Sequence, residues 1–355
     1  MKKNVVYILG AGFSAPMGIP VMREFVDKAR QLKRGNHQFD YFENVIKLIQ
    51  QTASAEKFFL HESGNIEEAL SLLEMKDNLE GTNTKQELIN FVVDVIIATT
   101  PKVPDFQIQQ MPTREWPALF TLNRDWQGYI AFVASLFGLQ FHEGTELGMR
   151  GIRAIRTNND TEYSIISMNY DMLIENSCEF LQHHYWWEKN IPIQFQIGNN
   201  TSSNESSPQL VKIHGSVDKK EVIPPTYNKG LYGSELPQSW RNAYNILVKA
   251  NHIRVLGYSL PQTDSYIKYL LMASIDKLKD LDRIDWIALD PSHELEDRFN
   301  QFITFRNKKF SNSNIKGYLE SIFAHSVNVS ASITTEQVSF TYLEQAHDEF
   351  MQKVK

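Results

Sequence analysis

The chain has 355 residues, of which 42% are hydrophobic and 22% charged, an ordinary composition for a soluble globular protein. Its net charge of −6 gives no electrostatic footprint for nucleic acid, so we expect no direct nucleic-acid binding. The single cysteine, Cys178, excludes a disulfide framework and a multi-cysteine zinc site, and we expect it to be a small buried residue on a helix. The length favours about two domains, or one large α/β domain with an insertion.

A short apolar strand near the N-terminus runs directly into a glycine turn. Residues 5–9 form the apolar run, and Gly10-Ala11-Gly12 follow with no side chain larger than a methyl group. Such a turn lets the backbone approach a ligand, and a following helix start would aim its N–H groups at a phosphate. The segment therefore predicts nucleotide binding. The turn alone is weak evidence, because Ala15 replaces the third glycine of the dinucleotide fingerprint and no P-loop Gly-Lys-Ser/Thr follows.

From about residue 38 to residue 137 the pattern is helical. Apolar residues recur there at spacings of three and four, which predicts amphipathic helices. Three of the predicted helices cover residues 39–49, 86–97 and 116–139. Another is expected to begin at the capping pair Asn65 and Glu68.

After about residue 150, predicted strands alternate with helices. The strands are expected at 163–168, 193–197, 210–213, 253–256 and 284–289, and the helices at 172–184, 264–277 and 334–354. This alternation predicts an α/β fold, a Rossmann-like parallel sheet with helices on both faces and a helical insertion after the first βα unit. We expect one domain from residues 1–30 and 151–333, a helical insertion at 31–150 and a C-terminal helix at 334–355.

Polar or glycine-rich residues follow each of the main predicted strands. Parallel sheets bind ligands beyond the carboxyl ends of their strands, so these residues would form one rim. They are Gly10–Ser14, Asn169–Asp171, His214–Ser216, Gly257–Leu260 and Asp290–Pro291. Each has an ordinary explanation alone, such as a helix cap or a buried strand-end histidine. Their combination predicts a binding site.

The segment from Gly10 to Arg23 resembles the first motif of the sirtuin family of NAD-consuming enzymes. That motif reads GAG-x-S, a three-residue gap, GIP, two more residues and Arg. The later strand ends follow the sirtuin order as well: Asn-x-Asp, His-Gly, Gly-x-Ser and an acidic residue before Pro. The resemblance therefore extends from the first strand to Pro291.

The resemblance implies a division of roles within an NAD site. His214 would be the general base, and Asn169 and Asp171 would orient the nicotinamide ribose and the attacking group. Gly257, Ser259 and Asp290 would hold the adenosine half. The remaining implied cofactor-binding residues, most of them around the pyrophosphate, are Gly10, Ala11, Gly12, Ser14, Ile19, Pro20, Arg23 and Gly215.

These roles agree with the chemistry of cutting NAD. Breaking the bond between nicotinamide and ribose develops positive charge on the ribose, which the oxygens of Asn169 and Asp171 can stabilise. A histidine with a pKa near neutrality suits activation of a hydroxyl or water. An acidic strand-end residue such as Asp290 suits a ribose hydroxyl.

Some residues depart from the pattern of sirtuin deacylases. The four-cysteine zinc module is absent, Met168 stands where deacylases usually have Gln, and Val21-Met22 replaces Asp-Phe. These differences argue against acyl-lysine binding and leave NAD cleavage in place. Residues 257–264 and 223–226 resemble the sirtuin-like domains of bacterial defence proteins, which hydrolyse NAD to nicotinamide and ADP-ribose and deplete it during phage infection.

The resemblance thus implies an NAD glycohydrolase with NAD as substrate and no metal. Three alternatives stay open: a non-catalytic sensor of NAD or ADP-ribose, a protein deacylase and a dehydrogenase. We expect a cytoplasmic protein, because no stretch reads as a signal peptide or a membrane span. An enzyme that destroys NAD needs control, so we expect a homo-oligomer or a separately encoded partner such as a HerA-type ring ATPase.

Overall fold

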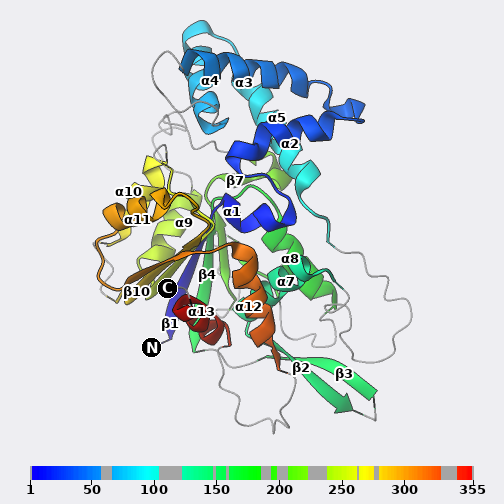
Figure 1. The fold of residues 1–355 in the computed structure, drawn as a ribbon, viewed down its shortest axis with the longest axis vertical. Helices are drawn as coiled ribbons and strands as arrows, with labels where there is room; N and C mark the ends of the chain where they lie inside the picture. Colours follow the sequence, from blue (N-terminus) through cyan, green and yellow to red (C-terminus); the bar gives the residue numbers. More distant parts are fainter. Residues whose placement is uncertain are drawn as a thin grey trace.

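The computed structural model describes residues 2–56, 66–103, 122–146, 149–156, 160–184, 193–197, 207–222, 238–261, 264–275, 280–328 and 342–353. At its centre is a seven-stranded sheet with the order β11-β10-β9-β1-β4-β6-β5, in which every neighbouring pair is parallel (Figure 1). The strands are β1 (Lys3–Leu9), β4 (Thr161–Ser167), β5 (Gln196–Ile197), β6 (Gln209–Lys212), β9 (His252–Leu256), β10 (Arg283–Ala288) and β11 (Lys308–Asn312).

The order of the strands changes direction at β1. The chain first adds β4 and β6 on one side of β1, then returns to the other side and adds β9, β10 and β11. This is the strand order of a Rossmann-like fold, so the predicted fold class is confirmed. The carboxyl ends of β1 and β9 meet at the topological switch point, where open parallel sheets bind their ligands.

Both faces of the sheet are buried, as the apolar run in β1 requires. Successive side chains of a strand point to opposite faces, so Val5, Tyr7 and Leu9 enter one core and Val6 and Ile8 enter the other. The first face is covered by α7 (Arg124–Leu136), α8 (Leu173–His184), α12 (Ile315–Ser326) and α13 (Tyr342–Lys353), and the second by α9 (Gln238–Leu247), α10 (Ser265–Ile275) and α11 (Glu294–Phe302) (Figure 1).

A separate group of helices, which we call the helical block, stands beyond the carboxyl end of the sheet (Figure 1). It consists of α2 (Phe25–Lys33), α3 (Phe42–Glu56), α4 (Ile66–Glu80) and α5 (Thr84–Thr99). Its core is built from aromatic side chains, among which Phe42 packs against Phe91 with 4.7 Å between ring centroids. Tyr170 and Val217, which follow β4 and β6, belong to the same core. The helical block is therefore fastened to the rim where the strands end.

The structure places some helices and strands differently from the sequence prediction. Helix α7 lies inside the predicted insertion, yet Trp126, Tyr129 and Phe132 pack in the core on the sheet. A hairpin of β2 (Leu139–Glu146) and β3 (Met149–Arg156) follows it, in a segment for which no strand was predicted. The capping residue Asn65 lies outside the described residues, and the domain boundaries stay a prediction.

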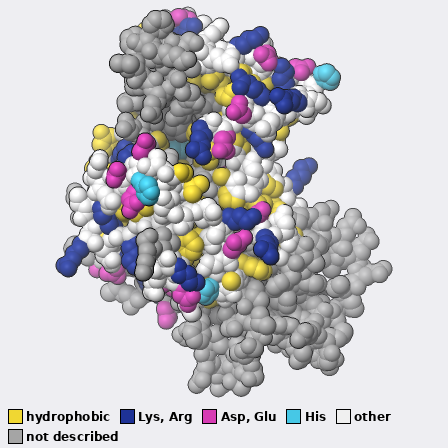
Figure 2. Space-filling view, viewed as in Figure 1, with side chains coloured by type: hydrophobic (Ala, Val, Ile, Leu, Met, Phe, Trp, Pro, Cys, Tyr) yellow, Lys and Arg dark blue, Asp and Glu magenta, His cyan; other side chains and the backbone are white. Residues whose placement is uncertain are grey.

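The surface and the helices carry two further observations. On the face drawn in Figure 2, basic side chains are interspersed with acidic ones over the helical block and the sheet layers. Among the helices of the described residues, none combines the length and the apolar character needed to cross a membrane.

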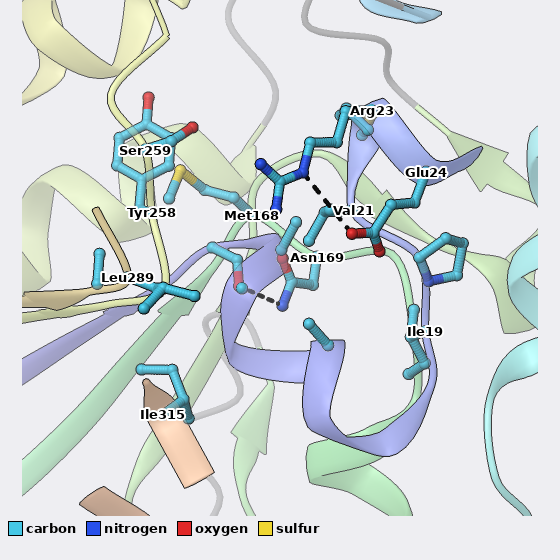
Figure 3. A pocket seen from close by; sticks show the side chains of 18 of the residues that line it. Ile19, Val21, Arg23, Glu24, Met168, Asn169, Tyr258, Ser259, Leu289 and Ile315 are labelled. Atoms are coloured by element: carbon cyan, nitrogen blue, oxygen red, sulfur yellow. Dashed lines mark hydrogen bonds and ion pairs between the residues drawn. The ribbon is translucent and has the colours of Figure 1, made fainter. Parts of the chain in front are cut away.

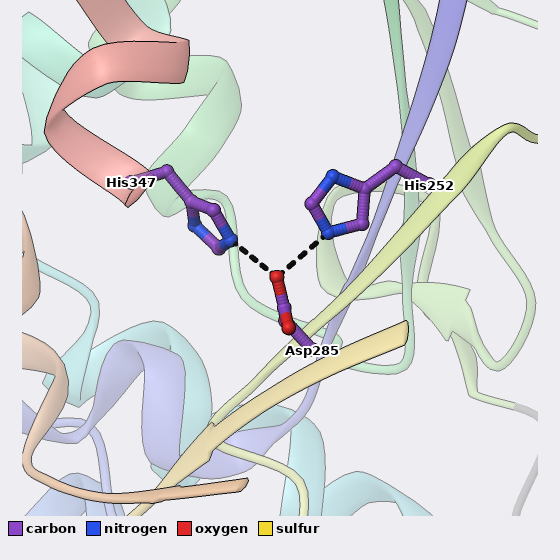
Figure 4. Close-up of side chains that lie close together, drawn as sticks. All are labelled: His252, Asp285 and His347. Atoms are coloured by element: carbon purple, nitrogen blue, oxygen red, sulfur yellow. Dashed lines mark hydrogen bonds and ion pairs between the residues drawn. The ribbon is translucent and has the colours of Figure 1, made fainter. Parts of the chain in front are cut away.

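Helix α13 is attached to the sheet through a buried cluster of His252, Asp285 and His347 (Figure 4). The Nε2 atoms of both histidines lie 2.8 Å from the same oxygen, Oδ2 of Asp285. Arg254, which has only donors, approaches Nδ1 of His252 to 3.2 Å, so this nitrogen accepts and Nε2 carries the proton. When a histidine binds a metal through one ring nitrogen, the other nitrogen normally carries a proton and donates it to an acceptor. Nδ1 of His252 faces Arg254, which has no acceptor. The three side chains are therefore held together by hydrogen bonds from the histidines to the carboxylate of Asp285.

A second route connects Arg254 to His347. Arg254 donates to the hydroxyl of Tyr7 at 2.7 Å, the hydroxyls of Tyr7 and Tyr318 lie 3.4 Å apart, and Tyr318 lies 3.0 Å from Nδ1 of His347. Arg254 also pairs with Glu344 of α13 at 2.8 Å. The network therefore ties β1, β9, β10, α12 and α13 together.

Candidate nucleotide-binding site

The glycine turn after β1 and the turn after β9 are packed backbone to backbone. Gly257 has a φ of +66°, and a Cβ atom built on it would lie 2.2 Å from the backbone nitrogen of Phe13. A Cβ atom on Gly10 or Gly12 would lie 2.7 or 2.8 Å from the carbonyl oxygen of Gly257. Only glycine fits at these positions, so the sequence motif serves the contact between two strands at the switch point.

Backbone hydrogen bonds hold this junction closed. The N–H of Gly12 donates to the carbonyl of Gly257 at 2.8 Å, and the N–H of Phe13 donates to Gly10 at 2.8 Å. The helix that follows, α1 (Ala11–Ser14), has only four residues. The expectation of a helix start that aims its N–H groups at a phosphate is therefore wrong for Gly12 and Phe13, whose N–H groups already have partners.

A cavity of about 940 Å³ opens at this junction, between the sheet and the helical block. Cavities of 300–1,000 Å³ are typical of small-molecule and cofactor sites. The predicted residues that line it are Gly10, Ala11, Gly12, Ile19, Pro20, Arg23, Asn169, Asp171, His214, Gly257 and Ser259. Residues from β1, β4, β6 and β9 thus meet in one space, as the sequence predicted from the strand ends.

Asn169 lies in the middle of the site (Figure 3). Its side-chain Nδ2 donates to the carbonyl of Gly10 at 2.9 Å and to the hydroxyl of Ser14 at 3.0 Å. A carbonyl can only accept, so the NH₂ group must face Gly10, and this fixes the orientation of the amide. Oδ1 of Asn169 is the amide atom left for a ligand. Ser14 does not line the cavity and acts by holding Asn169.

His214 lines the same cavity and is buried. Its Nδ1 lies 3.3 Å from the carbonyl oxygen of Met168, which makes Nδ1 the protonated nitrogen and leaves the lone pair on Nε2. Its ring lies 6.1 Å from the ring of Trp240 and 6.2 Å from that of Tyr170. The hydrogen bond therefore fixes the tautomer that a general base requires, with the lone pair on Nε2.

The loop that carries Asn169 and Asp171 is held by Lys212, a residue that the sequence analysis did not single out. Its ammonium donates to the carbonyl of Asp171 at 2.5 Å and to that of Tyr170 at 3.3 Å. It also forms an ion pair with Glu175 at 3.0 Å. Burial raises the pKa of Glu175, and the charge of Lys212 acts in the opposite direction. Lys212 therefore links the end of β6 to the loop after β4.

Asp171 has a structural contact as well as a place in the cavity. Its Oδ1 accepts from the backbone N–H of Leu173 at 3.0 Å, at the start of α8. Asp171 thus caps the start of α8, and it also lines the cavity.

Arg23 and Glu24 enter the site from the side of the helical block, opposite Leu289 and Ile315 (Figure 3). Arg23 Nε lies 3.6 Å from a carboxylate oxygen of Glu24. Both side chains are more than half exposed, so Arg23 can reorient toward a bound anion.

Besides Ser14, two predicted residues lie outside the cavity wall. Gly215 is not among its lining residues, and neither is Asp290. The carboxylate of Asp290 accepts from the N–H of Glu296 at 2.9 Å, so it caps the start of α11. The cavity wall also contains Tyr258, which belongs to the predicted rim segment Gly257–Leu260, and Asp264, which was not predicted as a site residue. The signal for Asp264 was the polar segment between a buried strand and a helix.

The single cysteine has no part in this site. Cys178 is buried in α8, and burial raises the pKa of its thiol to about 12. The prediction of a small buried helical residue is confirmed.

Comparison with known proteins gives one family match. Residues 163–322 match the family model of the SIR2-like domain. A search of curated proteins finds no match. Similar solved structures include Sir2 in complex with the inhibitor EX-527, 2′-O-acetyl-ADP-ribose and a deacetylated p53 peptide. Its sequence is 13% identical to this one, the match covers 91% of this chain and 94% of that chain, and the TM-score is 0.37.

Two further structures are similar at the same level. One is a structure described under the heading of the structural basis of sirtuin substrate affinity. It is 14% identical in sequence, the match covers 90% of this chain and 93% of that chain, and the TM-score is 0.37. Sir2Tm bound to a propionylated peptide has 13% identity, coverage of 91% and 93%, and a TM-score of 0.35. The region from β4 into α12 is therefore similar to the SIR2-like domain.

Proposed function

We propose that this protein is an NAD glycohydrolase that cuts NAD to nicotinamide and ADP-ribose. One observation carries the proposal: Asn169 and His214 line the same cavity as the glycine junction of β1 and β9. A dinucleotide that crosses this junction has one nucleoside over the ends of β4 and β6. Its nicotinamide ribose then lies beside an oriented amide oxygen and a neutral imidazole.

The reaction follows from the chemistry of these two groups. When the bond between C1′ and the nicotinamide nitrogen breaks, the electron pair leaves with nicotinamide and positive charge develops on the ribose. Oδ1 of Asn169 is oriented to stabilise this charge, and Asp171 holds the ribose in place. Nε2 of His214 accepts the proton of the water that attacks C1′.

The aromatic helical block favours hydrolysis over deacylation. Ile96 and Phe25 of the block line the cavity, so the block contributes apolar side chains to the cavity wall. The four-cysteine zinc module of deacylases cannot form in a chain with one cysteine.

The test is the release of nicotinamide from NAD by purified protein without an acyl-lysine peptide. Asn169→Ala and His214→Ala are expected to lower release by at least about 100-fold, because general acid–base catalysis alone contributes about 100- to 10,000-fold. Binding of NAD with no release by wild-type protein, with or without candidate partners, would favour a non-catalytic sensor.

We further propose that this activity depletes NAD in anti-phage defence, alone as an oligomer or with a separately encoded partner such as a HerA-type ring ATPase. The support is the resemblance of residues 257–264 to defence proteins; residues 223–226 lie outside the described residues. Cells expressing wild-type protein should lose NAD and resist phage, and cells expressing His214→Ala should do neither. Resistance without NAD loss would contradict the proposal.

A further inference from the structure

Asp264 is a buried carboxylate in the cavity wall that the proposed reaction leaves without a role. It is 4% exposed, lines the cavity and lies just before α10. Its Oδ2 accepts from the hydroxyl of Tyr258 at 2.9 Å. Its Oδ1 is buried and has no hydrogen-bond partner in the described part of the chain, so this oxygen does not cap α10. A buried oxygen of this kind is unfavourable until a bound molecule donates to it.

The start of α10 is directed toward the side of the cavity that holds His214. The ring of Tyr266, in the first turn of α10, lies 6.3 Å from the ring of Trp240, which in turn lies 6.1 Å from the ring of His214. Nε1 of Trp240 also donates to the carbonyl of Ile213 at 3.0 Å, directly before the histidine. These aromatic rings thus connect the start of α10 to the end of β6, where the nicotinamide end of NAD is proposed to lie.

Other polar groups of this side of the cavity already have a task. Asn169 presents Oδ1 to the ribose, and Oδ1 of Asp171 accepts from the N–H of Leu173. Hydrolysis also consumes a water, and a water held inside a protein needs two or more polar partners. In the proposed reaction Nε2 of His214 is one acceptor for this water. Oδ1 of Asp264, an acceptor in the same cavity wall, can be the second.

We propose that Asp264 holds the water that attacks C1′ of the nicotinamide ribose. The water donates one hydrogen to Oδ1 of Asp264 and the other to Nε2 of His214, which leaves a lone pair of its oxygen for C1′. As the bond between this oxygen and C1′ forms, the bond to nicotinamide breaks with its electron pair, and Nε2 takes the proton. Tyr258 is a positioning residue that fixes the carboxylate through Oδ2. The inference rests on the proposed cleavage of NAD.

The experiment compares two reactions of one site, hydrolysis of NAD and exchange of labelled nicotinamide into NAD. Both break the bond to nicotinamide, but only hydrolysis uses water. In Asp264→Asn the hydroxyl of Tyr258 retains the amide oxygen, so an NH₂ group replaces the acceptor Oδ1. Hydrolysis should fall at least about tenfold, whereas exchange and the Kd for NAD should change by less than about twofold. Asp290→Asn is the matched control, because Asp290 caps α11 outside the cavity wall, and it should keep both wild-type rates.

The outcomes separate this inference from the proposed function. If wild-type protein hydrolyses NAD and Asp264→Asn keeps the wild-type ratio of hydrolysis to exchange, Asp264 does not hold the water, and NAD cleavage stands. If wild-type protein releases no nicotinamide, the proposed function itself is wrong. Should Asp264→Asn fail to fold, Tyr258→Phe is the second variant. It keeps the carboxylate but loses the bond to Oδ2, so the ratio should fall about threefold.

A crystal structure of His214→Ala with NAD bound tests the same contact without turnover. We expect an ordered water within hydrogen-bond distance of Oδ1 of Asp264, facing C1′ of the nicotinamide ribose. A ribose hydroxyl or the carboxamide group of nicotinamide bound to Oδ1 would overturn the proposal. This structure also decides the case in which wild-type protein hydrolyses NAD without measurable exchange.

Discussion

Arg254 of β9 and Asp285 of β10 lie opposite each other in the register of the two strands, and both charged side chains are buried. The neutral histidines His252 and His347 connect them through hydrogen bonds. Burial acts to raise the pKa of Asp285, but the hydrogen bonds from His252 and His347 outweigh it and hold that pKa far below its usual range. Because His347 belongs to α13, the C-terminal helix completes the environment of a charged pair at the centre of the sheet.

Removal of His347 should destabilise the whole domain. His347→Ala deletes a donor to Asp285 and an acceptor for Tyr318, so we expect a loss of about 3 kcal/mol in the free energy of unfolding. His325→Ala, on the neighbouring α12, removes a partly exposed histidine paired with Glu349 and should have a far smaller effect. Chemical denaturation measures both. Equal losses would contradict a special role for the buried network.

The same histidines make stability depend on pH. Burial and the charge of Arg254 lower the pKa of His252 from its ordinary 6.5 to about 4, and they lower the pKa of His347 as well. The unfolded chain therefore binds more protons in this window, so the stabilisation is complete above about pH 6.5 and is lost as the pH falls toward 4. Thermal melting across this range should show the decrease, and His347→Ala should show a shallower one.

Gly257 is expected to be the least replaceable glycine of the site. Gly257→Ala places a methyl group against the backbone of Phe13 at a positive φ, so we expect a loss of about 3 kcal/mol or more and loss of nucleotide binding. Gly81→Ala is the control, because Gly81 also has a positive φ of +71° but open space around its Cβ position. It should lose about 1–2 kcal/mol and keep binding. Similar losses for both would show that the close approach at the junction is unimportant.

Lys212 should affect catalysis through the loop of Asn169 and Asp171. Lys212→Met removes the bonds to the loop carbonyls and leaves Glu175 buried without its cation, so both stability and turnover should fall. Adding Glu175→Gln should recover stability, because it removes the unpaired charge, but should leave kcat reduced by about tenfold or more. If the double variant also recovers kcat, Lys212 has no positioning role.

The sequence predicted the sheet because its central strands are apolar on both faces. β1, β4, β9 and β10 stand close to their predicted places, and so do α8 and α10. The edge strand β11 was missed because its sequence, Lys-Lys-Phe-Ser-Asn, has no apolar run. Helix α12 has apolar residues at Ile315, Tyr318, Leu319 and Ile322, a pattern that could have identified it.

The sequence predicts a residue's place at the rim when that residue directly follows a buried strand, and predicts it less well when long-range contacts decide. The positions of Asn169 and His214 in the cavity wall were predicted because each residue follows a strand. Asp290 also ends a strand, but the sequence does not reveal that α11 begins close enough to take its carboxylate as a cap. Asp264 lies beyond a turn, and only the folded chain shows that its carboxylate reaches the cavity.

The most direct test of the account is the stoichiometry of NAD cleavage by the purified protein over a range of protein concentrations. We predict equal amounts of nicotinamide and ADP-ribose from wild-type protein, and at least about 100-fold slower release of both from His214→Ala, although that variant still binds NAD. Wild-type protein that binds NAD but releases no nicotinamide at any concentration, or a His214→Ala variant as active as wild type, would contradict it.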